Sequence, residues 1–291
     1  MLWIAATLIA AVAQTARNAA QRQLTGEVGT MGATAVRFIF GAPFAILLLG
    51  PLALHQALPL PGTGTLLWAC AGALSQIGAT ALMLQAMRSR GFGVITALMK
   101  TEPVTLAILG AIILAEPLGP LRMAAIAVAT AGVLLMSGAD LRRGSLGPAL
   151  LGIGSGVLFG LSAIGFRGAI LALPDGDFLT RAGTVLAISL TMQAALTLIW
   201  LAVTDRQALA GIARHWRHSV GAGFLGAFAS LFWFIGFALT PAANVRTLAL
   251  VEVVLAQIVS GRLMRQETTP RQIAGMALIV AGVGALILAS R

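Results

Sequence analysis

The sequence predicts an all-α integral membrane protein with ten transmembrane helices, arranged as a five-plus-five inverted repeat. Three observations predict this fold: the composition, a series of long apolar stretches, and an internal similarity between the two halves. Of the 291 residues, 58% are hydrophobic and 10% are charged, and the mean hydropathy is +0.95. Because soluble domains carry about 25% charged residues, this chain has too little polar surface to coat a soluble domain.

The strongly basic balance fits the same class. A net charge of +10 and a pI near 11.8 would suggest nucleic-acid binding in a soluble protein. In a membrane protein such charges usually lie in short cytoplasmic loops, and this chain has no basic arm with interleaved aromatic residues, so no nucleic-acid partner is expected. Cys70 is the only cysteine, which excludes a disulfide within the chain. Walker, zinc-protease and EF-hand patterns are absent from the sequence. Gly221–Gly226 matches the dinucleotide-binding pattern, but it opens a membrane span with no preceding strand, so no cofactor or metal is expected.

Ten apolar stretches are each about as long as the roughly 20 helical residues that cross a bilayer core. In order, they cover residues 2–24, 31–54, 65–87, 92–115, 121–138, 147–173, 178–203, 219–239, 243–264 and 270–289. The breaks between them are Gly26-Glu27, Pro59–Pro61, Arg88–Arg90, Glu116-Pro117, Arg142–Gly144, Pro174–Asp177, Asp205-Arg206, Thr240-Pro241 and Glu267–Pro270. The first stretch resembles a signal peptide, but it lacks a preceding basic region. The repeat also uses it as a helix, so we expect an uncleaved first span.

The two halves are related by a shift of 150 residues, the offset between Glu102 and Glu252. The same shift places Arg17 on Arg167 and Pro120 on Pro270. Charged residues are rare here, so these coincidences indicate a duplicated five-helix unit: residues 1–138 and 148–291, joined by a linker at 139–147. An odd number of spans makes the two copies face opposite ways. Inverted repeats are the layout of alternating-access transporters, whose substrate site lies between the repeats, although a channel or a scaffold could also be duplicated.

The arginines predict the orientation of the chain in the membrane. Those in loops on the side away from the N-terminus are Arg22, Arg88, Arg90, Arg142, Arg143, Arg206, Arg214, Arg217, Arg262 and Arg265. The loops on the N-terminal side hold little beyond Arg122, and the C-terminus ends in Arg291. The arginine-rich side is therefore expected to be cytoplasmic, with both termini outside.

Charged residues inside the spans are the first candidates for a site, because each costs at least ~2.5 kcal/mol to insert. Lys100, the only lysine, and Glu102 lie in the fourth span, and Pro103 disfavours helical geometry at Glu102. A broken helix would present both side chains to one cavity, where they would clamp a substrate or titrate. The alternative is a structural Lys100–Glu102 pair that holds the span against its neighbour.

The remaining charged candidates have alternatives of the same kind. Glu252 is the repeat equivalent of Glu102, and Arg246 is its expected partner, in either a structural or a coupling role. Arg17 and Arg167 lie near helix ends, where they either snorkel to the interface or gate the path by pairing with an acid of the other half. Arg37 and Arg181 lie early in the second and seventh spans, so both are expected at the membrane–water interface, without a role in transport.

Aromatic and amide residues complete the candidate site. Trp233, Phe234 and Phe237 share one helical stripe of the eighth span, which serves either as packing or as the wall of an apolar pocket. Gln14 and Gln76 are cheaper to bury than charges, and hydrogen bonds between helices are their default role; both may also line the cavity. An enzyme is not predicted: Ser155 lies in a pattern like that of an intramembrane serine protease, but no span contains a histidine to act as its base.

Several short motifs resemble the EamA-type branch of the drug/metabolite transporter superfamily. They are Ala35–Phe38, Glu102–Val104, Glu116–Pro120, Gln272–Gly275 and Ala281–Val283. The resemblance covers the whole chain and implies a secondary carrier of small metabolites in a bacterial inner membrane. Because the two inverted halves of one chain already form a complete carrier, a monomer is expected. Bacterial members of this branch include amino-acid exporters of the YddG type.

The expected function is therefore alternating-access export of a small amphipathic metabolite, with neutral or aromatic amino acids as the leading class. Lys100 would bind the carboxylate, Glu102 would hold Lys100 or bind the amino group, and the aromatic stripe would receive the side chain. The alternatives are a multidrug or organic-cation efflux carrier and, from another class, a membrane scaffold that transports nothing.

Overall fold

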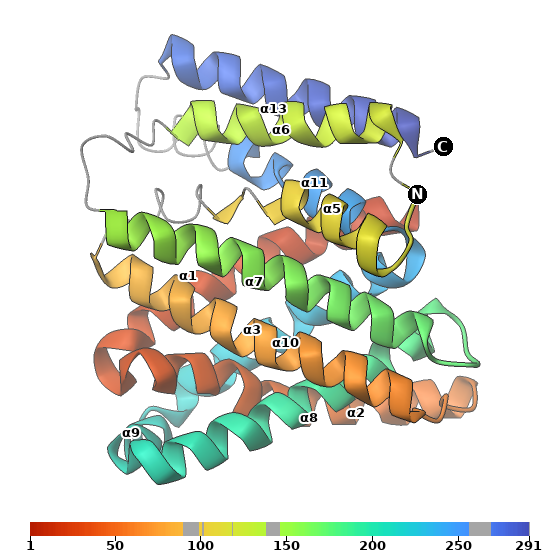
Figure 1. Cartoon of the computed structure of the whole chain (residues 1–291). Helices are drawn as coiled ribbons and strands as arrows, with labels where there is room; N and C mark the ends of the chain where they lie inside the picture. The colour runs from red at the N-terminus through yellow and green to blue at the C-terminus, as the bar shows by residue number, and fades with distance from the viewer. Residues whose placement is uncertain (90–98, 101, 118, 138–145, 256–268, 291) are drawn as a thin grey trace.

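The computed structural model describes residues 1–89, 99–100, 102–117, 119–137, 146–255 and 269–290, and the regular secondary structure in these ranges is helical (Figure 1). The helices are α1 (Leu2–Ile39), α2 (Gly41–His55), α3 (Thr63–Ser89), α5 (Glu102–Ile113), α6 (Pro120–Ser137), α7 (Leu146–Leu171), α8 (Phe178–Thr204), α9 (Arg206–Arg214), α10 (Trp216–Leu239), α11 (Ala242–Leu248) and α13 (Pro270–Ala289). Residues 139–145 of the expected linker lie outside the described residues. So do residues 92–98 of the expected fourth span and 256–264 of the ninth.

The first two expected spans are the two limbs of a sharply bent segment. Gly29 interrupts α1 with φ +71° and ψ 176°, a backbone conformation that favours glycine. The first limb ends at Val28, and the second limb runs back and continues into α2. Together they form the segment Leu2–His55, one of six described segments that are long and apolar enough to cross a membrane.

The packing of the helices follows the inverted repeat. Helix α3 of the first repeat packs along α7 of the second, and their repeat equivalents, α10 and α1, pack in the same way. Between α6 and α13, a Cβ on Gly132 would lie 2.7 Å from the Gly275 carbonyl oxygen, and a Cβ on Gly282 would lie 2.7 Å from that of Ala125. Adding 150 to Gly132 and to Ala125 gives Gly282 and Gly275. The two contacts are therefore related by the duplication, and the fold is a five-plus-five membrane helical fold.

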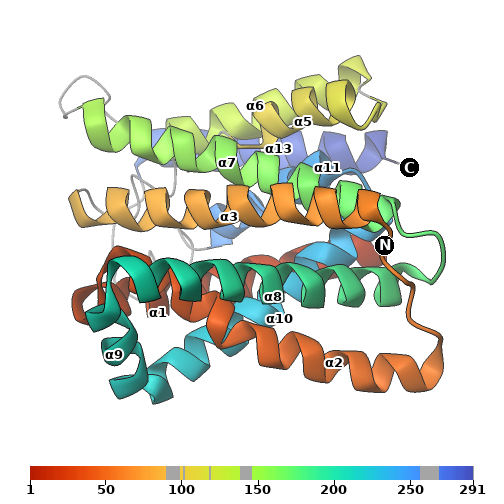
Figure 2. The same ribbon diagram turned by 60° about the horizontal axis from the view of Figure 1, so that its bottom comes forward.

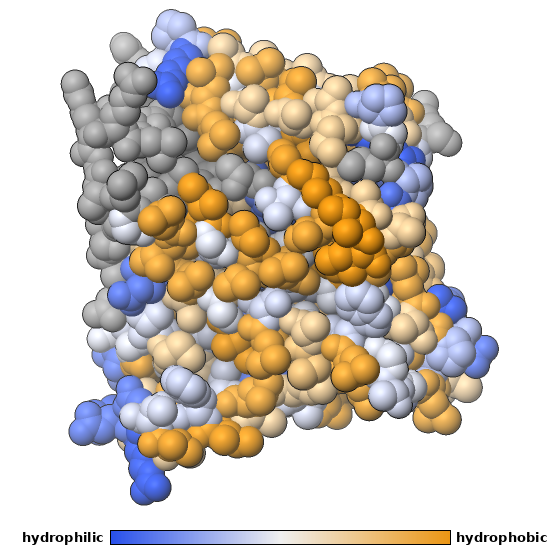
Figure 3. Space-filling model, viewed as in Figure 1, coloured by the Kyte–Doolittle hydropathy of each residue, from blue (hydrophilic) through white to orange (hydrophobic). Residues whose placement is uncertain are grey.

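The surface has the polarity of a protein embedded in lipid. Large apolar side chains such as Leu47, Ile112 and Val203 are exposed along the helices. Figure 3 shows apolar side chains across the middle of one face, with the hydrophilic ones mainly at the edges where helices end. In Figures 1 and 2 both chain termini lie at one end of the helices and α9 lies at the other.

Candidate functional site: crossed ion pairs between the two repeats

The described parts of the fourth and ninth spans are both interrupted, at positions related by the repeat. A turn at Lys100 precedes α5. In the ninth span α11 ends at Leu248, and the next backbone N–H groups bond three residues back, from Leu250 to Thr247 (3.0 Å) and from Glu252 to Ala249 (3.1 Å). Such tightened turns inside a helix often mark functional positions. Discontinuous helices at equivalent places in two inverted repeats mark the substrate site in many transporters.

Two ion pairs join these interrupted spans. Lys100 Nζ pairs with Glu252, and Arg246 Nε lies 3.0 Å from Glu102 Oε1. The partners expected from the sequence, Lys100 with Glu102 and Arg246 with Glu252, are therefore wrong: each glutamate pairs with a base of the opposite repeat. The expectation failed because it relied on neighbours along the chain, whereas two antiparallel spans cross here.

Local sequence explains where Glu102 lies. It begins α5, where a carboxylate interacts favourably with the helix dipole. Pro103 occupies the second position, at which a helix needs no backbone N–H donor. Small residues of α7 bring the span close: a Cβ on Gly156 would lie 2.8 Å from the Met99 carbonyl oxygen, and one on Gly160 would lie 3.8 Å from Glu102 Cγ. The glycine face of α7 thus packs against the segment that carries Lys100 and Glu102.

Two of the three aromatic candidates lie beside Arg246. Its Cζ is 4.1 Å from the centroid of the Trp233 ring and 5.7 Å from that of Phe237. Trp233 Nε1 donates to Gln14 Oε1 at 3.0 Å, which ties α10 to α1. Phe234 instead packs on Phe166 of α7, with ring centroids 4.7 Å apart. All three side chains are buried, so they form the packed surroundings of the ion pairs in this conformation.

Arg17 and Arg37 lie on the two limbs of α1, and each is only 1% exposed. Arg17 lies 11 residues before Val28, or about 16 Å along the axis. The snorkelling alternative for Arg17 and the interface position expected for Arg37 are therefore both wrong. The first limb extends beyond the expected end at residue 24, and so Arg17 is deeper than the sequence indicated. Arg181, by contrast, is near a helix end and donates to the Asp175 and Pro174 carbonyl oxygens.

The hydrogen bonds of these two arginines go to neutral groups. Arg17 Nη2 donates to Asn18 Oδ1 at 2.6 Å, and Arg37 donates to the hydroxyls of Thr80 (3.2 Å) and Ser230 (3.5 Å). Arg37 reaches Ser230 of α10, three residues before Trp233, whose ring lies beside Arg246, and Arg17 passes the same helix at Gly226. They therefore belong to the same charge cluster as the crossed pairs.

Gln76 holds helices together. The side-chain oxygen of Gln76 accepts a hydrogen bond from Gln193 Nε2 of α8 at 3.0 Å. Its backbone carbonyl oxygen accepts a hydrogen bond from the Thr80 hydroxyl at 2.8 Å. Since Thr80 in turn accepts from Arg37, Gln76 supports the cluster from one turn away.

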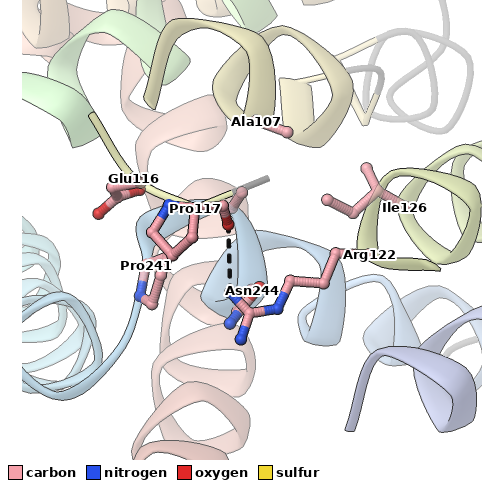
Figure 4. A pocket seen from close by; sticks show the side chains of 8 residues that line it. Ala107, Glu116, Pro117, Arg122, Ile126, Pro241 and Asn244 are labelled. Atoms are coloured by element: carbon pink, nitrogen blue, oxygen red, sulfur yellow. Dashed lines mark hydrogen bonds between the residues drawn. The ribbon is translucent and has the colours of Figure 1, made fainter. Parts of the chain in front are cut away.

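A second set of contacts joins the two repeats near the C-terminal ends of α5 and α7. Arg167 pairs with Glu116 of the other repeat and donates to the Phe237 carbonyl oxygen. Glu116 also lines a cavity of about 10 Å³, beside which Arg122 donates to the Pro117 carbonyl oxygen at 3.2 Å (Figure 4). That volume holds about one water molecule. Arg167 is 9% exposed and paired with an acid of the other half, which favours the gating alternative over snorkelling.

Three of these residues were missed by the sequence reasoning: Arg37, Glu116 and Thr80. Arg37 could have been found because it lies within an apolar span, where charged residues are rare. Glu116 could have been found as the acid nearest the end of its span, on the side to which Arg167 points. Thr80 carried no signal. Among the described residues, no group of three or more His, Cys, Asp or Glu side chains could hold a metal ion.

An inverted duplication of membrane helices, with interrupted spans that bring charged side chains together, is the architecture of membrane transporters. The model of the EamA-like transporter family matches residues 1–138 and 147–288, once for each half. The chain therefore belongs to the EamA-like transporter family, within the drug/metabolite transporter superfamily.

Comparison with solved structures supports the fold. A chain described only as a protein, from a crystal structure, is similar with a TM-score of 0.67 over 98% of this chain and 99% of its own length. The two sequences are 18% identical, so the likeness shows the fold alone. The sequence matches none of the curated proteins with which it was compared.

Proposed function

We propose that this transporter exports small carboxylate-bearing metabolites by alternating access, with amino acids as the first class to test. Its substrate site is the crossing of the fourth and ninth spans. The observation that carries the proposal is the pair of crossed ion pairs, because each joins one repeat to the other through a charge that a substrate carboxylate or amino group can replace.

The cluster keeps unused hydrogen-bonding capacity for such a substrate. Glu252 Oε2 is buried and makes no hydrogen bond, and Arg246 Nε and Glu102 Oε1, although 3.0 Å apart in their ion pair, are not aligned for a hydrogen bond. A substrate carboxylate would compete with Glu252 for Lys100, and an amino group would bind Glu102. Trp233 and Phe237 keep Arg246 in place through cation–π contacts.

Substrate binding would also loosen the connection between the repeats. When Lys100 exchanges Glu252 for the substrate, one of the two ion pairs between the spans is lost. The Arg167–Glu116 contact then keeps its own end of the transport path closed while the substrate site exchanges substrate at the opposite end. When this contact is released, its end opens and the opposite end closes. In this scheme Arg17 attracts the substrate, while Arg167 acts as the gate.

The test is counterflow of labelled amino acids into proteoliposomes that contain purified protein. The variant is Lys100→Met combined with Glu252→Gln, which removes both charges of one pair and leaves no unpaired charge behind. Glu27→Gln is the matched control, because Glu27 is 59% exposed and lies away from the site, 3.5 Å from His215.

We expect uptake by the wild type and by the control, and none by the folded double variant. Uptake by the double variant would refute this site. Absence of uptake for every amino acid by folded wild type would remove amino acids as the substrate class. Direction is read from the same vesicles: for an exporter, net flux into inside-out membrane vesicles exceeds flux into right-side-out ones.

A further inference from the structure

The charges at the centre of the molecule do not balance. Six charged side chains interact there, four of them cations and two carboxylates: Arg17, Arg37, Lys100, Glu102, Arg246 and Glu252. The other acidic residues in the described ranges do not belong to this cluster. Glu116 pairs with Arg167, Glu27 lies beside His215, and the three aspartates lie at helix ends. Within the described chain, the cluster therefore carries a surplus of two positive charges.

Arg17 and Arg37 are the source of the surplus. The acids of the cluster are held by Lys100 and Arg246. Among the described residues, these two guanidinium groups donate hydrogen bonds only to an amide and two hydroxyls, and Arg37 also lies 5.0 Å from the Phe38 ring centroid. Arg37 Nε is buried without any hydrogen bond. Buried charges are normally paired, because an uncompensated one is expensive.

Both arginines flank the same point on α10. A Cβ on Gly226 would lie 3.6 Å from Arg17 Cδ and 3.5 Å from Arg37 Cβ, so both arginines lie at van der Waals distance from the same residue of α10. The planar fork of a guanidinium matches the geometry of carboxylates and phosphates. Two arginines that pass the same residue of α10 suit an anion with two negative charges.

We propose that the substrate is a small organic dianion, a dicarboxylate or a phosphate ester, bound by Arg17 and Arg37 in addition to Lys100. This inference rests on the proposed transport function and narrows its substrate class. A neutral zwitterionic amino acid would leave the surplus charge uncompensated, whereas a dianion cancels it. Acidic amino acids carry two carboxylates and one ammonium group, so their net charge lies between that of a neutral amino acid and that of a dianion.

The test compares substrates and variants in one counterflow assay. The panel is succinate, glutamate, glycerol 3-phosphate, leucine and phenylalanine. The variants are Arg17→Gln and Arg37→Gln, with Arg181→Gln as the control arginine near a helix end. We expect succinate or glycerol 3-phosphate to be exchanged in preference to leucine and phenylalanine. The first two variants should weaken binding of the dianion about tenfold or more, as loss of a charged hydrogen bond does.

Thermal unfolding separates this role from a structural one. Because each substitution removes an unpaired buried charge, Arg17→Gln and Arg37→Gln should unfold at the same temperature as wild type or higher. The dianion should stabilise wild type by mass action but stabilise the variants less. Succinate and glycerol 3-phosphate serve as the probes, and whichever of them stabilises wild type identifies a dicarboxylate or a phosphate site.

The outcomes distinguish the two proposals. Exchange of neutral amino acids, without competition or stabilisation by either dianion, would overturn this inference and leave the transport site standing. Strong destabilisation by both arginine substitutions, with dianion binding unchanged, would also overturn it. No exchange of any compound by folded wild type would overturn the proposed function itself.

Discussion

At the scale of single residues, rarity was the most informative signal in the sequence. Lys100, Glu102, Arg246 and Glu252 were identified because charges inside apolar spans are costly, and the structure brings all four together. Their partners could not be predicted, because pairing depends on the depth at which two helices cross. Arg37 was misplaced for the same reason: its distance from the interface depends on the bend at Gly29.

The Lys100–Glu252 pair should be strongly coupled. Lys100→Met leaves Glu252 without its partner in a site where the two side chains are 12% and 14% exposed, so we expect a loss of about 3 kcal/mol in unfolding free energy. The double variant with Glu252→Gln should recover most of this loss. Thermal unfolding in detergent of the single and double variants gives the coupling energy. Additive effects would show that the two charges act independently.

At the scale of helices, the apolar stretches and their breaks predicted most elements well. The limits of the first limb were the main failure: Gly26-Glu27 predicted a break, but the helix continues to Val28 before Gly29 turns it. Neither residue 26 nor 27 has to leave a helical conformation, whereas the positive φ at Gly29 does require a residue without a side chain. The error was small along the sequence but placed Arg17 too near the membrane surface.

The glycine face of α7 should be needed to position the site. Gly156→Ala places a Cβ 2.8 Å from the Met99 carbonyl oxygen, which must shift together with Lys100. We expect a loss of about 1–3 kcal/mol in stability, as for other overpacked contacts, together with reduced transport.

Gly154→Ala is the matched control on the same helix, since its Cβ would make an ordinary contact of 3.5 Å with Leu82. Unfolding and counterflow are measured for both variants. Equal behaviour of the two would show that α7 does not fix the fourth span.

The cap of α8 gives a pH-dependent prediction. The Thr180 backbone N–H and hydroxyl donate to Asp177 and hold the pKa of that carboxyl below its ordinary value. A lowered pKa means that the stabilisation is present above the unfolded-state pKa, near 3.9, and is lost as pH falls through the folded value.

Asp177→Ala should therefore cost about 1 kcal/mol at neutral pH. The difference between variant and wild type should start to shrink below about pH 4, where the unfolded-state carboxylate is protonated, and should be lost as pH falls through the lowered pKa of the folded state. Asp177→Asn, which keeps a cap without a charge, should lose less. Unfolding measured between pH 3 and 7 tests this, and a constant difference across that range would contradict it.

At the scale of the whole molecule, the 150-residue shift predicted the architecture, and the structure adds the symmetry-related glycine contacts of α6 and α13. The same symmetry extends to the two interrupted spans. The sequence could not predict the Arg167–Glu116 pair, because this pair depends on the relative positions of the repeats.

The arginine count predicts that both termini lie outside the cytoplasm. Reporter fusions at each terminus, one active only in the cytoplasm and one active only outside it, measure this directly. Both termini should report the outside. A cytoplasmic signal from either would reverse the orientation, and the end closed by Arg167 and Glu116 would then face the cytoplasm.

The central claim is that the two repeats form an alternating-access path through the crossing of the fourth and ninth spans. It is tested most directly by labelling Ser230→Cys, beside Arg37, in a Cys70→Ser background with a membrane-impermeant thiol reagent applied to each side in turn. The site should react only from the end opposite the Arg167–Glu116 contact, and Glu116→Gln should make it reactive from the other end. Labelling of wild type from both sides at once, or from neither side in both proteins, would contradict the account.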